Sequence, residues 1–215
     1  MEYSRTAHAK KNMIAGLINK IAILIVQFIV RTLLIKKLGA DYLGLNNLFS
    51  SILQVLNMAE LGFSSAIVFS LYKPVAEHND VMICALMKFY RNVYKIVGLV
   101  ILVVGSILTP FLPYLISGSY PIDINIYVLF WIFLLNTVFS YLAFAYKNVL
   151  LTSTQRQDIV SNISSVLDVT KGIVQIFSIV VLKNYYVYII WNVIFTIINN
   201  IIIARITNRM YPNYV

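Results

Sequence analysis

The stretch IVGLVILVVGSILTPFLPYLI, residues 96–116, decides the fold class because it contains no charged side chain. A helix needs about 20 mainly apolar residues to cross the hydrocarbon core of a bilayer. Pro110 and Pro113 predict that this helix bends or ends near its last turn. Comparable apolar segments occupy 13–35, 44–71, 125–146, 159–182 and 187–206. The sequence therefore predicts an all-α, polytopic membrane bundle of six transmembrane helices, in a single lobe over residues 1–215.

The composition agrees with this class. Hydrophobic residues make up 60% of the chain and charged residues 12%, which is far from the balance of a soluble domain. The loops are short and leave no room for a soluble domain. The net charge of +9 is spread over these loops rather than gathered in one basic surface, so we do not expect a nucleic-acid partner.

The distribution of Lys and Arg predicts the orientation. If the N-terminus is cytoplasmic, eleven of these residues lie in inside loops and three, Lys36, Lys37 and Lys183, lie in outside loops. Inside loops are normally the more basic ones. We therefore expect a multi-pass protein with both termini in the cytoplasm.

Polar side chains inside the predicted spans fall on defined helix faces. Such groups are costly in hydrocarbon and normally face a bundle interior or a watery cavity. Three spans carry a polar stripe at helical spacing: Lys20, Gln27 and Arg31 in the first, Gln54, Asn57 and Glu60 in the second, and Asp168, Lys171 and Gln175 in the fifth. We predict that these stripes line a polar pathway.

Simpler roles remain open for the same residues. Lys20 and Arg31 lie within two turns of a span end, so each can reach the headgroups along its flexible stem. Asp168 and Lys171 are three residues apart on a helix and can neutralise each other. Amide and hydroxyl groups in membrane helices often serve as hydrogen bonds between helices.

Glu60 is the residue that reaches an interface least easily, because its short side chain lies in the middle of the segment 44–71. It can pair with Lys20, Arg31 or Lys171, or it can bind a coupling proton or sodium ion. Gly62 would ease a local break in the helix, and broken helices recur in transporter sites.

No pattern of catalytic residues is present in the sequence. His8 lies in the N-terminal tail and His78 in a loop, apart from any nucleophile or metal-ligand cluster, and no phosphate-binding glycine loop occurs. Cys84 is the single cysteine. We expect a protein that is not an enzyme and that uses no cofactor or metal.

Several stretches of the sequence resemble a known family. RTLLIKKLGADYLGLNNLFSSILQVLNMAELGFSSAI (31–67), SLYKPVAEHN (70–79) and ITNRMYPNY (206–214) resemble the Wzx-type polysaccharide biosynthesis flippases. These belong to the multidrug/oligosaccharidyl-lipid/polysaccharide exporter superfamily. Within the first stretch, LGADYLGL and AELGF are the most recognisable parts. The likeness covers essentially the whole chain.

The resemblance implies a function and a partner. Members of this superfamily consist of two similar lobes, and this chain resembles the N-terminal lobe, so a C-terminal lobe or a partner chain would complete it. The implied substrate is an isoprenoid-lipid-linked oligosaccharide for O-antigen or capsule biosynthesis, moved by alternating access across the bacterial inner membrane. Lys20, Arg31 and Lys171 would then bind its anionic diphosphate head. The side chains that would form hydrogen bonds with sugar hydroxyls are Gln27, Gln54, Asn57 and Gln175. Asp168 and Glu60 would bind a coupling ion or form structural ion pairs.

Two other functions remain open. A drug or cation antiporter of the same superfamily would depend more on carboxylates in the cavity than on Arg or Lys. A non-transporting membrane assembly subunit would use the polar stripes to bind partner helices.

Overall fold

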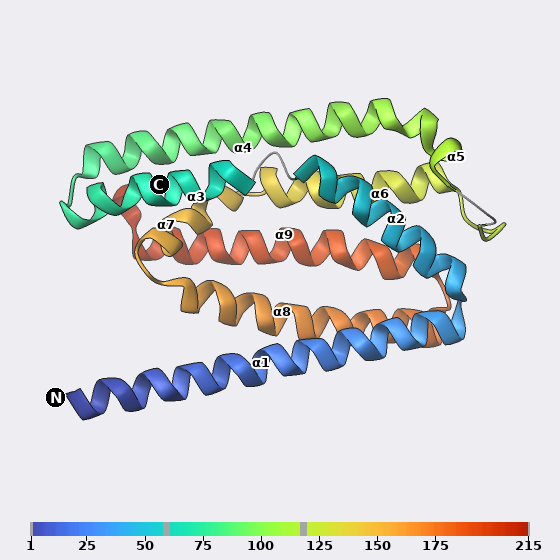
Figure 1. Cartoon of the computed structure of the whole chain (residues 1–215), viewed down its shortest axis with the longest axis horizontal. Coiled ribbons are helices and arrows are strands. Elements are labelled where there is room, and N and C mark those ends of the chain that lie inside the picture. Colours follow the sequence, from blue (N-terminus) through green and yellow to red (C-terminus); the bar gives the residue numbers. More distant parts are fainter. Residues whose placement is uncertain (1, 58–60, 117–119, 215) are drawn as a thin grey trace.

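The computed structural model describes residues 2–57, 61–116 and 120–214, and these residues form helices joined by short turns, with no strand among them (Figure 1). The predicted all-α class is therefore confirmed. The longer helices are α1 (Glu2–Lys37), α2 (Ala40–Asn57), α3 (Leu61–Ala76), α4 (Asp80–Leu108), α6 (Ile126–Leu142), α8 (Gln157–Phe177) and α9 (Tyr185–Met210). Short elements are η2 (Thr109–Phe111), α5 (Leu112–Leu115), η3 (Ala145–Lys147), α7 (Asn148–Ser153), the π-helical turn η4 (Ser178–Leu182) and η5 (Pro212–Tyr214).

Three helical segments of the described chain are long and apolar enough to cross a membrane: Asp80–Leu115, Gln157–Leu182 and Tyr185–Met210. A fourth is added if α6 and the segment Ala145–Ser153, which meet at a bend of 44°, count as one span. The bend follows Phe144, whose φ of 61° lies in the left-handed region and ends the regular helix. These segments make the chain a candidate membrane protein, and the number of six spans stays a prediction.

Two predicted helix boundaries can be compared with the structure. α4 ends at Leu108 and continues as η2 and α5, so the bend expected at Pro110 and Pro113 is confirmed. Of the single helix expected over 44–71, the structure describes α2 up to Asn57 and α3 from Leu61, so both parts are helical and the join between them lies outside the described residues. Glu60 lies outside the described residues.

Asparagine side chains mark the start of three of the long helices. Asn79, Asn125 and Asn184 each accept a hydrogen bond from a backbone N–H in the first turn of α4, α6 and α9. A capping side chain satisfies a donor that the helix itself leaves unpaired. These caps fix where each apolar segment begins.

The long helices lie side by side in the order α1, α8, α9, α6 and α4, and α2 packs against both α1 and α6 (Figure 1). Two glycines allow close approach. A Cβ on Gly172 of α8 would clash with Val26 of α1, and a Cβ on Gly105 of α4 would clash with Leu134 of α6. Small residues at such contacts let membrane helices pack closely. Gly172 therefore sets how near α1 lies to the polar face of α8.

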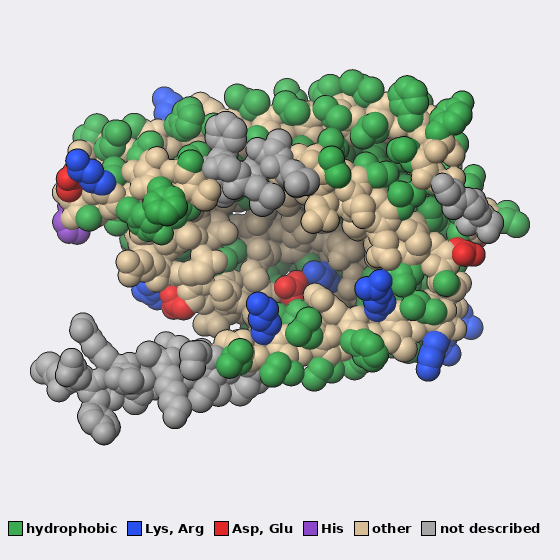
Figure 2. Space-filling model, in the orientation of Figure 1, with side chains coloured by type: hydrophobic (Ala, Val, Ile, Leu, Met, Phe, Trp, Pro, Cys, Tyr) green, Lys and Arg blue, Asp and Glu red, His purple; other side chains and the backbone are tan. Residues whose placement is uncertain are grey.

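The core lies between α2 and α6, where Phe49 is fully buried and makes edge-to-face contacts with Phe130 and Phe133. By contrast, α4 exposes large apolar side chains such as Leu99, Val103 and Ile107. Figure 2 shows hydrophobic side chains along this upper edge of the molecule. Such an apolar exterior suits contact with lipid.

Hydrogen bonds between distant segments tie together one end of the bundle. The Tyr42 hydroxyl donates to the Asp123 carboxylate at 2.7 Å, and the Tyr185 hydroxyl donates to the backbone oxygen of Tyr42 at 3.1 Å. Burial and the neighbouring carboxylate raise the pKa of Tyr42 to about 12. Tyr42 therefore keeps its proton, and remains a donor, throughout the physiological pH range.

The opposite end is held by the C-terminal segment. The Tyr214 hydroxyl donates to Asp80 at 2.8 Å, and the Cys84 thiol lies 3.3 Å from the backbone oxygen of Asn213. Lys147 is 5% exposed and donates to Asn208 of α9. Both chain termini lie toward this end of the bundle (Figure 1).

Candidate functional site

A hollow opens near the middle of the face shown in Figure 2, and both basic and acidic side chains lie in or beside it. One part of it, which we call the charged cavity, has a volume of about 240 Å³ and lies between α1, α2, α8 and α9. Its polar lining residues are Gln27, Arg31, Asn46, Asn47, Asp168, Lys171, Gln175, Tyr188 and Asn192. Residues from the predicted stripes of the first and fifth spans thus meet around one cavity.

Lys171 and Asp168 form an ion pair within the charged cavity. The Lys171 Nζ lies 2.8 Å from the Asp168 carboxylate, one turn away on α8. The side chains are 25% and 38% exposed, so water screens the attraction and the pair adds little stability. The ion pair between Asp168 and Lys171, considered above as a simpler role for these residues, is therefore present in the structure.

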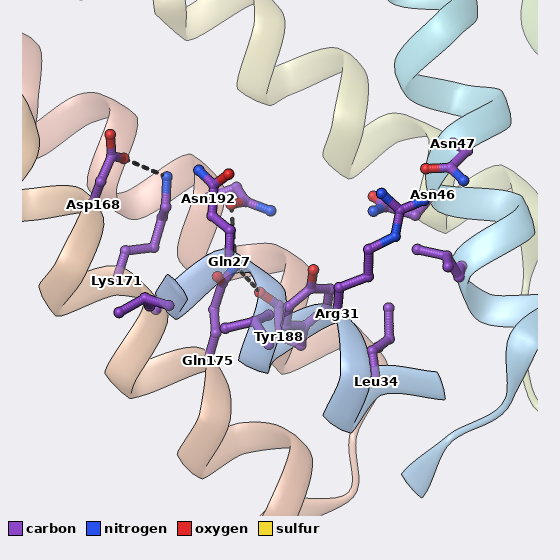
Figure 3. A pocket seen from close by; sticks show the side chains of 14 residues that line it. Gln27, Arg31, Leu34, Asn46, Asn47, Asp168, Lys171, Gln175, Tyr188 and Asn192 are labelled. Atoms are coloured by element: carbon purple, nitrogen blue, oxygen red, sulfur yellow. Dashed lines mark hydrogen bonds and ion pairs between the residues drawn. The ribbon is translucent and has the colours of Figure 1, made fainter. Parts of the chain in front are cut away.

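Arg31 is the cation of the charged cavity that has no ion-pair partner among the described residues. It makes no salt bridge with any carboxylate of the described chain. Figure 3 shows its guanidinium extending from α1 toward Asn46 and Asn47 of α2. Because Lys171 and Asp168 cancel, the described lining carries a formal charge of +1 that resides on Arg31. An anionic group is the natural ligand for such a site.

Gln175 connects two helices as well as lining the charged cavity. It is 6% exposed, and its amide nitrogen donates to the Tyr188 backbone oxygen at 3.3 Å and to Asn192 Oδ1 at 3.1 Å (Figure 3). Both amide protons are therefore used between α8 and α9. Gln175 therefore has a structural role, a hydrogen bond between two helices, which is one of the two roles considered above for such amides.

Gln54 and Asn57 line a neighbouring cavity of about 310 Å³ between α2, α6 and α9, which we call the amide cavity. Asn46 and Asn192 line both this cavity and the charged cavity, so the two adjoin. The other polar lining residues are Ser50, Asn136 and Thr137. The stripe of the second span therefore faces the same hollow as those of the first and fifth.

A third cavity continues the series toward the chain termini. This tyrosine cavity has a volume of about 220 Å³, and its polar lining residues are Tyr94, Ser140, Tyr141, Asn148, Ser164, Asn199 and Asn200. Tyr141 links it to the amide cavity by donating to Asn57 Oδ1 at 3.2 Å. Each of the three cavities thus has a polar contact or shared residue with the next.

Two predicted site residues are not placed in this hollow. Lys20 is exposed on α1 and lines none of the three cavities. Glu60 is outside the described residues. Over the described ranges, no three His, Cys, Asp or Glu side chains gather where they could share a metal ion.

Some residues that line the cavities are not among the substrate-binding residues predicted from the sequence, chiefly Asn192 and Asn199 of α9. Their separation of seven residues, with Thr196 between them, is a helical spacing that places all three on one face. That signal was present in the sequence. Asn46 also shows a helical spacing, four residues before Ser50 and eight before Gln54, whereas Asn148, between Lys147 and Val149, gains its place only through packing.

Comparisons of the chain with protein-family models, with curated proteins and with solved structures each give no match. The likeness to the flippases therefore rests on the sequence stretches quoted above.

Replacing Gln175 with Leu tests the bridge between α8 and α9. The change leaves the partners on Tyr188 and Asn192 without their donor, and we expect it to lower the free energy of unfolding by about 1–2 kcal/mol. Chemical denaturation in mixed micelles measures the effect. Gln54→Leu is the matched control, because Gln54 is exposed and makes no hydrogen bond within the described chain. Equal stability of the two variants would show that the bridge contributes nothing.

Proposed function

We propose that the protein is the N-terminal lobe of a flippase that moves an isoprenoid-lipid-linked oligosaccharide across the bacterial inner membrane for surface polysaccharide synthesis. The observation that carries this proposal is Arg31, a cation in a polar hollow that has no ion-pair partner among the described residues, within a bundle whose exterior is apolar. The family resemblance of the sequence supplies the substrate class. In this proposal, the apolar segments make up six spans.

The chemistry of the hollow suits such a substrate. A lipid diphosphate is anionic, and a guanidinium can bind two phosphate oxygens at once. Lys171 supplies a second cation if the phosphate competes with Asp168. The amides that surround these groups offer hydrogen bonds to sugar hydroxyls. No covalent bond is made or broken, so no acid, base or nucleophile is required.

The hollow is open on the face seen in Figure 2. In our proposal a second lobe, in the same or a partner chain, closes this side, and the substrate moves between the two lobes by alternating access. The sugar chain then crosses the membrane in contact with polar groups, while its lipid tail stays in the bilayer.

The alternative of a cation antiporter finds less support in the geometry. Such a site requires a carboxylate that is available to a cation. Asp168 is the carboxylate that lines the described cavities, and Lys171 already occupies it at 2.8 Å. The net positive lining favours an anionic substrate.

Replacing Arg31 with Ala tests the proposed anion site. We expect surface polysaccharide export to fall at least about tenfold, since one charge-assisted contact with the substrate is worth about 1.5–3 kcal/mol, while the amount of protein in the membrane stays unchanged. Export is measured by surface labelling of the polysaccharide. Arg31→Lys should retain part of the activity, and Lys36→Ala, on the same helix outside the cavity, should retain all of it. Equal export by Arg31→Ala and the native protein would contradict the assignment.

The proposed orientation places both termini in the cytoplasm. Cys84 lies beside the C-terminal segment, and Lys183 lies next to the start of α9, close to Tyr185 at the other end. A membrane-impermeant maleimide should label a Lys183→Cys, Cys84→Ser variant in intact cells. It should label native Cys84 only after the inner face is opened. The reverse pattern would show that the protein is inserted the other way.

A further inference from the structure

The amide cavity and the tyrosine cavity differ from the charged cavity in one respect. No Asp, Glu, Lys, Arg or His side chain of the described chain lines either of them. Their polar groups are amides and hydroxyls, set among apolar residues. The hollow therefore changes from a charged region near Arg31 to an uncharged, hydrogen-bonding region over the rest of its length.

Several of the lining amides have a donor to spare. Three asparagine side-chain oxygens are already engaged: Asn57 accepts from Tyr141 at 3.2 Å, Asn136 from Thr196 at 2.9 Å and Asn199 from Ser164 at 3.0 Å. These bonds hold each amide in place. The amide nitrogens of the same three residues have no acceptor within the described chain, so their N–H donors are available for a ligand.

Acceptors are also available in the tyrosine cavity. Asn200 Nδ2 lies 3.4 Å from the backbone oxygens of Phe139 and Ser140, which leaves its Oδ1 for another partner. Asn148 Oδ1 is buried and receives no hydrogen bond from any described residue. A buried acceptor without a donor is unfavourable, so a ligand hydroxyl that donates to Asn148 would remove that cost.

Aromatic rings complete the tyrosine cavity. Tyr94 and Tyr141 both line it, with ring centroids 5.5 Å apart and planes inclined by 55°. Aromatic side chains present an apolar body beside a polar tip, which matches a sugar ring, whose C–H groups and hydroxyls also alternate. The combination of spare donors, spare acceptors and rings suits a neutral polyhydroxylated ligand.

We propose that the amide and tyrosine cavities bind uncharged sugar residues, so that the oligosaccharide carried by this protein lacks acidic groups in the part next to the lipid diphosphate. The inference rests on the proposed function and narrows its substrate class. The diphosphate lies at Arg31 in the charged cavity, and the sugars extend from there past Asn192 and Asn57 toward Asn148.

The physical reason for selectivity is desolvation. A sugar carboxylate in these cavities loses water, and no described cation of the lining replaces it. A neutral hydroxyl loses less, because it can both donate to and accept from an amide. Acidic sugars are therefore rejected by the absence of a partner rather than by their size.

The test compares two synthetic substrates with the purified protein in lipid nanodiscs. One is undecaprenyl diphosphate that carries a trisaccharide of neutral hexoses, and the other has one hexose replaced by the matching hexuronic acid. We expect the neutral compound to bind about tenfold more tightly or better, since the buried carboxylate stays unpaired. Undecaprenyl diphosphate without sugar serves as the reference for the charged cavity.

A substitution that adds a cation sharpens the test. Gln54→Lys places an ammonium group at the amide cavity without breaking a hydrogen bond of the described chain, and it should restore binding of the acidic compound to the level of the neutral one. Asn162→Lys, an exposed position on α8 that lines none of the three cavities, is the matched control and should leave the preference unchanged.

The outcomes separate this inference from the proposed function. Failure of all three lipid diphosphates to bind would overturn both. Binding of undecaprenyl diphosphate with equal or tighter binding of the acidic trisaccharide would overturn the sugar assignment alone and leave the flippase proposal standing. A neutral preference that Gln54→Lys does not change would place the selectivity outside these cavities and would also overturn the inference.

Discussion

Polar side chains in a bilayer have no bulk water to bind, and the cost of leaving them unpaired constrains the rest of this structure. The bundle meets the constraint in two ways. Some groups pair with one another, as Lys171 does with Asp168 and as Gln175 does with Asn192. The others, with Arg31 foremost, converge on one hollow. Close packing at Gly172 brings α1 near enough to α8 for the stripes of both helices to share that hollow.

Helical periodicity was sufficient to predict a large part of the site. Gln27 and Arg31 lie one turn apart and face the charged cavity together with Asp168, Lys171 and Gln175. Periodicity assigns residues to a face of one helix but does not say which helices become neighbours. For that reason Asn46 and Asn192, which have a helical spacing in their own segments, could not be assigned to the charged cavity from the sequence. Lys20 was predicted at the site, but it lies on α1 outside the three cavities.

Local and long-range features of the structure differ in how far the sequence predicts them. The all-α class and the bend at the prolines were predictable because both follow from local chemistry. The role of Gln175 was not, since the two acceptors of its amide come from α9, on the far side of a turn.

The central claim is that the hollow is filled with water while apolar helix faces contact lipid. It is tested most directly by placing a cysteine at Asn192, where the charged and amide cavities meet, in a Cys84→Ser protein reconstituted in nanodiscs. The reference is Val103→Cys on the exposed apolar face of α4.

A charged, water-soluble thiol reagent requires an ionised, hydrated thiol. We predict that it modifies the cysteine at 192 at a rate comparable to one at the exposed position 183, and leaves the one at 103 unmodified. Equal protection of positions 192 and 103 would contradict a water-filled hollow, and with it the proposed transport pathway.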